Sequence, residues 1–101
     1  MSELPIACTL TPEALQARRE GLLARLLNRA QDHELTAEGL RLRFVAANDT
    51  LPAITRAVDA ERQCCRFLRF DITVEPDGGP MMLELTGPPG TRDFIAALLD
   101  L

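Results

Sequence analysis

Hydrophobic and polar residues alternate with period two over four segments of the chain, a pattern typical of strands with one buried face. The four segments are residues 4–10, 40–45, 70–75 and 81–86. Residues 76–80, with the sequence PDGGP, contain the residues typical of a tight turn and predict a hairpin between the last two strands. A turn at residues 37–39 likewise suggests a hairpin whose first arm is residues 34–36.

Hydrophobic residues with helical spacing lie between these strands. A first helix is expected from Thr11, where a Thr-Pro-Glu sequence supplies an N-cap, a proline at the first helical position and an early acid. It should end near Gln31 or Asp32. A second helix is expected to begin at residues 48–50 and to run to about Leu68.

A last helix follows the strand break at residues 87–90 and is expected to be capped by Thr91. Its expected inner face carries Phe94, Ile95, Leu98 and Leu99. The order along the chain is then strand, helix, strand or hairpin, helix, hairpin, helix, and the strands have polar alternate faces. The sequence therefore predicts a single α+β domain over residues 1–101, with two layers: a mainly antiparallel sheet and helices packed on one face.

Composition and charge narrow the class of protein. The chain has 101 residues, 47% hydrophobic and 26% charged, which suits one folded domain. Its net charge of −4 makes nucleic acid an unfavourable partner. No membrane span or signal peptide is recognisable, and three cysteines without a disulfide framework indicate reduced thiols, so we expect a cytoplasmic protein without a membrane partner. All 11 basic residues are arginine, which suggests a GC-rich bacterial genome.

The most distinctive chemistry resides in Cys8, Cys64 and Cys65, together with Glu61. In the second predicted helix, Glu61 belongs to an otherwise apolar row that includes Cys65. Cys64 and Cys65 follow Glu61 by three and four residues, so both thiols are expected close to its carboxylate. Cys8 is expected on the inward face of the first strand. We therefore expect the three sulfurs to meet between sheet and helix, with Glu61 beside them.

Such a site would suit a thiophilic metal or metalloid ion. Thiolates bind soft ions such as Cu(I), and also Zn(II), and the same softness extends to Hg(II) and As(III). Three sulfurs fit a trigonal site, with Glu61 as a base or an additional ligand. Zinc prefers four ligands, and His33 is the only histidine that could complete such a set. The predicted function is sequestration, sensing or transfer of the ion, and it requires Cys8 to lie within about 10 Å of at least one of the other two sulfurs.

Two other interpretations of the cysteines stay open. Cysteine is among the most frequently buried residues, so all three could be core residues of an interaction or oligomerisation module, and a homodimer is compatible with the sequence. A small thiol-dependent redox enzyme would instead use Cys64 or Cys65. Both lie near the C-terminal end of the second helix, where the helix dipole disfavours a thiolate, so we favour a protein that is not an enzyme.

Three segments, PIACTLTPEAL, ERQCCRFLRF and TVEPDGGPMMLELTGPPG, resemble segments of a group of small bacterial proteins. The similarity runs over nearly the whole length and includes Cys8, Glu61, Cys64 and Cys65. Such proteins are associated with heavy-metal resistance and with neighbouring mercury-type regulators, so the resemblance implies the handling of a thiophilic ion and no defined activity. The chain has no helix-turn-helix arrangement and is not expected to be the regulator itself.

Overall fold

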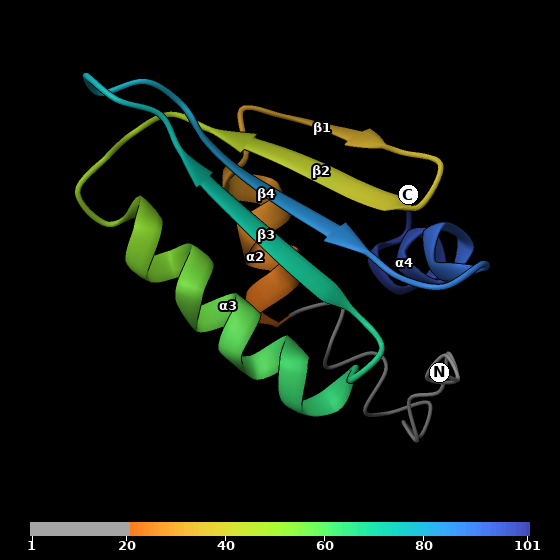
Figure 1. Ribbon diagram of the computed structural model, residues 1–101. Helices are drawn as coiled ribbons and strands as arrows, with labels where there is room; N and C mark the ends of the chain where they lie inside the picture. The colour runs from red at the N-terminus through yellow and green to blue at the C-terminus, as the bar shows by residue number, and fades with distance from the viewer. Residues whose placement is uncertain (1–20) are drawn as a thin grey trace.

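A computed structural model of the protein describes residues 21–101, which form three helices and four strands (Figure 1). The helices are α2 (Leu22–Arg29), α3 (Thr50–Cys64) and α4 (Thr91–Leu99). The strands are β1 (Asp32–Leu35), β2 (Gly39–Phe44), β3 (Arg69–Val74) and β4 (Met81–Thr86). The strand predicted at residues 4–10 and the helix start predicted at Thr11 lie outside the described residues.

The four strands form one antiparallel sheet in the order β1-β2-β4-β3. The predicted hairpin of β3 and β4 is confirmed: its turn has positive φ at Asp77 and Gly78, and the Glu75 N–H donates to the Pro80 carbonyl at 3.2 Å. The predicted hairpin of β1 and β2 is confirmed as well, although Gly39, expected in the turn, is the first residue of β2. Pairing of β2 with β4 joins the two hairpins, so β1 and β3 are the edges of the sheet that residues 21–101 form.

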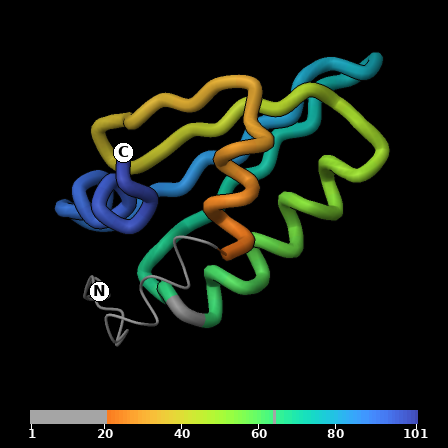
Figure 2. Tube along the Cα trace, turned by 180° about the vertical axis from the view of Figure 1, so that it is seen from behind, coloured from red at the N-terminus to blue at the C-terminus, as the bar shows by residue number. Residues whose placement is uncertain are grey.

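One face of the sheet is apolar and covered, and the other is polar and exposed. In β2, Leu40 and Leu42 are 0% exposed, whereas Arg41 between them is exposed. Helix α2 crosses the apolar face, behind the sheet in Figure 1 and in front of it in Figure 2, and it packs against α3. Sheet and helices share one hydrophobic core. The predicted two-layer α+β fold with an antiparallel sheet is therefore confirmed.

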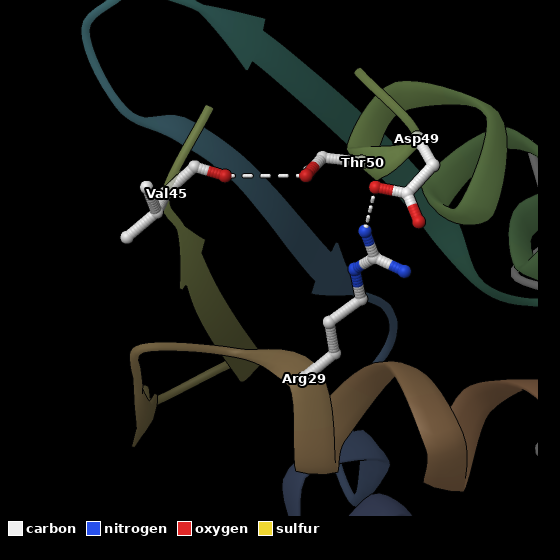
Figure 3. Close-up of polar contacts among 4 residues, drawn as sticks. All are labelled: Arg29, Val45, Asp49 and Thr50. Atoms are coloured by element: carbon white, nitrogen blue, oxygen red, sulfur yellow. Dashed lines mark hydrogen bonds and ion pairs between the residues drawn. The ribbon is translucent and has the colours of Figure 1, made fainter. Parts of the chain in front are cut away.

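An ion pair between two side chains connects the end of α2 to the start of α3 (Figure 3). Arg29, the last residue of α2, forms an ion pair with Asp49, the N-cap residue of α3. Thr50 is 1% exposed, and its hydroxyl donates to the Val45 carbonyl at 3.2 Å. The predicted helix start is confirmed, but the Asp49 side chain makes no capping hydrogen bond and serves instead as the partner of Arg29.

The predicted end of the first helix is two or three residues too late. Helix α2 ends at Arg29 rather than at Gln31 or Asp32. The reason is that the chain enters the sheet earlier than its hydrophobic pattern suggests: the Gln31 N–H already donates to the Arg43 carbonyl of β2 at 2.7 Å. A backbone donor held by a neighbouring strand cannot also continue the helix.

Helix α4 begins at Thr91, one residue after its N-cap. The N-cap is Gly90, with φ 98 in the left-handed region, so the prediction of Thr91 as the cap is wrong by one position. The Thr91 hydroxyl donates instead to the Pro88 carbonyl at 2.6 Å, inside the loop that precedes the helix. The predicted inner face is confirmed for Ile95, Leu98 and Leu99, which are buried, and Phe94 packs half-buried against the same core.

Candidate thiolate site at the end of helix α3

Helix α3 ends between the two adjacent cysteines. Cys64 is its last helical residue, and Cys65 is its C-cap, with φ −113 and ψ 78. The Cys65 N–H still donates to the Glu61 carbonyl at 2.7 Å, while the Cys65 carbonyl accepts from the Leu68 N–H at 3.1 Å. The prediction that this helix continues to Leu68 is therefore wrong, because the chain leaves the helix at Cys65 and turns toward β3.

The early helix end allows two successive hydrophobic side chains to be buried. Phe67 is 6% exposed and Leu68 is 8% exposed, but adjacent residues of a helix are about 100° apart around its axis and cannot both face the core squarely. In the turn, Phe67 packs edge-on against Phe94 of α4, with ring centroids 5.1 Å apart. The contact joins two distant parts of the chain, so hydrophobic spacing within the predicted helix could not reveal it.

Glu61 and Cys65 are both buried beside this turn. Glu61 is 2% exposed, and Cys65 is 0% exposed within the hydrophobic core. The structure thus places both residues inward, as their shared row in the sequence predicts. Buried carboxylates pair with other groups or coordinate metal ions, because desolvating an isolated charge is very unfavourable. The site therefore brings a soft sulfur and a hard, ionisable oxygen into the interior within one helical turn.

The structure describes neither of the other two sulfur atoms. Cys8 lies outside the described residues, and Cys64 is described through the backbone of α3 and not through its side chain. The meeting of the three sulfurs therefore stays a prediction. Apart from these two cysteines, residues 21–101 contain no group of three or more His, Cys, Asp or Glu side chains arranged to hold a metal ion.

His33 is not brought to this site. It is exposed on β1 and pairs with Leu42 of β2. Across the rest of the sheet, Leu42 pairs with Leu83 and Leu83 pairs with Ile72 of β3. Three strand spacings, about 14 Å in total, thus separate His33 from the strand that follows Cys65. The structure does not support His33 as the fourth ligand of a zinc site.

The helix dipole at the end of α3 favours a bound cation, whereas Arg62 and Arg66 beside it carry positive charge. The last carbonyl groups of a helix carry partial negative charge, and Glu61 contributes a carboxyl group at the same end. Arg62, the basic residue of the last turn, is an exposed side chain whose Nε lies 2.9 Å from the carboxylate of Asp59. The dipole at a helix C-terminus disfavours a bare thiolate in general, whereas thiolates that share a bound cation are stabilised by the charge of the ion.

A separate hollow of about 460 Å³ lies between α2 and α3. It is lined by three arginines and several apolar residues, among them Arg25, Arg29, Arg56, Leu26 and Ala53. Among residues 21–101, the lining contains no cysteine, histidine or carboxylate, and its guanidinium groups would repel a cation, so these residues do not form a site for a soft ion. The sequence did not reveal the cluster, because only the packing of α2 on α3 brings Arg56 beside the other two arginines.

Comparisons with protein-family models, with curated proteins and with solved structures found no match for this chain. The candidate site is therefore interpreted from its own residues alone.

None of the helices within residues 21–101 is both long enough and apolar enough to cross a membrane.

Proposed function

We propose that this protein binds a thiophilic metal or metalloid ion through Cys8, Cys64 and Cys65, with Glu61 as a base or an additional ligand. The observation that carries the proposal is the joint burial of Glu61 and Cys65 at the end of α3, at 2% and 0% exposure. The protein would sequester, sense or transfer the ion in the reducing cytoplasm of a bacterium, where its thiols stay reduced.

The chemistry of these residues suits a soft ion better than a hard one. Three thiolates favour Hg(II), As(III) or Cu(I), which accept trigonal sulfur coordination, over ions that prefer oxygen ligands. Each thiol must lose its proton when it binds the ion, so binding releases protons and strengthens as the pH rises. In this proposal the Glu61 carboxyl, four residues before Cys65 in the sequence, accepts such a proton or completes the ligand set.

Two alternatives explain less of the site. A catalytic or redox thiol needs access and a field that stabilises its thiolate, whereas Cys65 is 0% exposed at the negative end of a helix. A purely structural core explains the burial of Cys65. It assigns no function to the carboxyl group of Glu61 at the same end of the helix.

The experiment is a titration of the reduced, full-length chain with Hg(II), As(III), Cu(I) and Zn(II). Ligand-to-metal charge-transfer absorption reports sulfur coordination, and the chain contains no Trp and no Tyr to obscure the near-ultraviolet region. Because Cys65 is buried even without an ion, thiols must be counted in three samples: the native ion-free protein, the unfolded ion-free protein and the native protein with the ion. We expect one equivalent of a soft ion to protect the sulfurs that are reactive in the ion-free native protein.

Two variants test the assigned ligands, and a third is a control. Cys8→Ser should weaken binding at least about tenfold and change the charge-transfer spectrum, whereas the neighbouring Thr9→Ser should bind like the unmodified protein. Glu61→Gln keeps the side-chain shape and should weaken binding about 10- to 100-fold. Binding of none of the four ions would overturn the proposal, and so would unchanged binding by Cys8→Ser. A single thiol alkylated unusually fast near neutral pH would favour the enzyme instead.

A further inference from the structure

The two edges of the sheet differ in how they are protected against pairing. β1 is four residues long and exposes Asp32, His33 and Glu34, and short, charged strands are a common protection against edge pairing. β3 is six residues long, RFDITV, and contains no proline, glycine or lysine. Of the two edge strands that residues 21–101 form, β3 is therefore the less protected against pairing with another chain.

The helix side of β3 carries apolar side chains that are only partly covered. Phe70, Ile72 and Val74 pair with Leu85, Leu83 and Met81 of β4, respectively, so they lie on the apolar face of the sheet. Leu83 in β4 is 0% exposed, but Ile72 opposite it is 39% exposed and Val74 is 52% exposed. The apolar face of the sheet thus continues to the β3 edge, where its side chains are only partly covered.

The backbone of β3 alternates in the direction of its polar groups. The N–H of Glu75, the residue after β3, donates to the carbonyl of Pro80, which lies opposite it. Every second residue before Glu75, namely Thr73, Asp71 and Arg69, therefore also directs its backbone N–H and C=O groups toward β4. Phe70, Ile72 and Val74 accordingly direct their N–H and C=O groups away from β4. The same three residues therefore present both partly exposed apolar side chains and the backbone groups that a further strand would bind.

We propose that β3 pairs with the β3 strand of a second copy of this chain, antiparallel about a two-fold axis at Ile72, so that one sheet runs through both copies. This surface does not include Cys65 or Glu61, and the proposal is independent of ion binding. A two-fold axis perpendicular to a sheet places residues of the same face opposite one another, so both helix layers lie on the same side. The axis at Ile72 then places the Ile72 side chains of the two copies opposite each other.

The side chains select this register. With the axis at Ile72, Phe70 lies opposite the partner's Val74 on the apolar face, and Arg69 lies opposite the partner's Glu75 on the polar face. Opposite charges in directly facing positions stabilise a strand pair, and like charges destabilise it. The two-fold axis generates two Arg69–Glu75 pairs, one at each end of the paired strands, and both stabilise this register.

Neighbouring registers are less favourable. An axis at Asp71 would place the two Asp71 carboxylates opposite each other, and an axis at Thr73 would place Asp71 opposite the partner's Glu75, which also pairs like charges. An axis at Phe70 would leave Val74, the most exposed apolar residue of β3, beyond the paired segment. The charges therefore disfavour the axes at Asp71 and Thr73, and the apolar residues favour the axis at Ile72 over the axis at Phe70.

The size of the contact predicts a weak dimer. Pairing through Phe70, Ile72 and Val74 of both strands provides about six intermolecular backbone hydrogen bonds. A single strand pair buries less than the roughly 1,600 Å² of a standard interface. We expect a dissociation constant of about 10 μM, in the range of transient assemblies.

The first test is sedimentation of the reduced full-length chain as a function of concentration, with and without added ion. We expect a monomer–dimer equilibrium that Ile72→Lys weakens at least about tenfold, because two ammonium groups would face each other at the axis. The matched control is His33→Lys, which adds the same side chain at an exposed position of the other edge and should leave dimerisation unchanged. Far-ultraviolet circular dichroism checks that each variant is folded. A protein that is monomeric up to about 1 mM would overturn the proposal, as would an Ile72→Lys variant that dimerises normally.

The second test examines the register. Arg69→Glu and Glu75→Arg should each weaken the dimer about tenfold, because each creates two pairs of like charges, and the combined variant should recover affinity to within about threefold. Asp71 faces the partner's Thr73 in this register, and its carboxylate lies 3.5 Å from the Nε of Arg69 on its own strand. Asp71→Asn should therefore change dimerisation less than either charge reversal. If Asp71→Asn instead strengthens the dimer and the charge exchange has no effect, the register is wrong.

Discussion

At Gly39 the sheet depends on the absence of a side chain. This glycine is buried as the first residue of β2 and pairs with Thr86 of β4. A Cβ atom at this position would lie 1.8 Å from the backbone oxygen of Leu85. Because the obstructing atom is backbone in the neighbouring strand, it cannot rotate away as a flexible side chain would. Gly39 therefore permits the close approach of β2 and β4 that joins the two hairpins.

We predict that Gly39→Ala destabilises the protein by about 3 kcal/mol, because β2 and β4 must separate locally to admit the methyl group. The free energy of unfolding is measured by urea denaturation. Gly78→Ala is the matched control: Gly78 has φ +70 and no atom within 4 Å of an added Cβ, so only backbone strain of about 1 kcal/mol is expected. Equal destabilisation by the two substitutions would contradict the close-approach explanation.

Between elements, the ion pair of Arg29 and Asp49 links the end of α2 to the start of α3. The hydrogen bond from Arg29 holds the pKa of the Asp49 carboxyl below its ordinary value of 3.8, and a backbone hydrogen bond and the positive charge of Arg29 lower it further. Protonation of Asp49 is therefore less favourable in the folded chain than in the unfolded chain. The resulting stabilisation is present above pH 3.8 and is lost as the pH falls through the lowered pKa of the folded state.

We predict a small decrease in the melting temperature for Asp49→Asn at neutral pH and low salt, because both side chains are accessible to solvent. This difference should vanish as the pH falls through the lowered pKa of Asp49, which lies below 3.8, and should shrink as salt is added. In an Arg29→Gln background, Asp49→Asn should have no such effect. A difference between the two proteins that persists unchanged in acid would show that Asp49 acts through something other than its charge.

The sequence predicts the elements whose boundaries are set by neighbouring residues. It does not locate helix ends that are set by contacts with distant residues. The PDGGP turn at residues 76–80 defines its hairpin locally, and the structure contains it as expected. The end of α3 was misplaced because the contact of Phe67 with Phe94 is tertiary. The end of α2 was misplaced because the Gln31 N–H is taken by the neighbouring strand, which the helical pattern does not encode.

Across the whole molecule, the sheet order decides which predicted site residues can meet. The hydrophobic row of the second helix correctly predicted that Glu61 and Cys65 face inward. The sequence did not reveal that His33 would lie on the opposite edge of the sheet from β3, because pairing of β2 with β4 involves residues about 40 positions apart. The same pairing makes β3 an edge, so the proposed dimer surface could not be found from local patterns either.

The layered core also predicts how destabilisation varies across the sheet. Leu83 in the central strand β4 is 0% exposed, whereas Ile72, opposite it on β3, is 39% exposed. We predict that Leu83→Ala destabilises the protein by about 3 kcal/mol and Ile72→Ala by about 1 kcal/mol, because the cavity left at Leu83 is enclosed on all sides. Urea denaturation at a concentration well below the dimer dissociation constant measures both. Equal losses would show that the two positions do not differ in packing as the structure indicates.

The complete burial of Cys65 has a kinetic consequence. A reagent can reach this sulfur only when the end of α3 opens, so its modification rate reports the opening equilibrium at low reagent concentration and the opening rate at high concentration. The same reasoning applies to an ion held there. Its residence time would depend on how often the surrounding chain opens locally as well as on the strength of the metal–sulfur bonds. A protein that rarely opens at this position would therefore exchange a bound ion slowly.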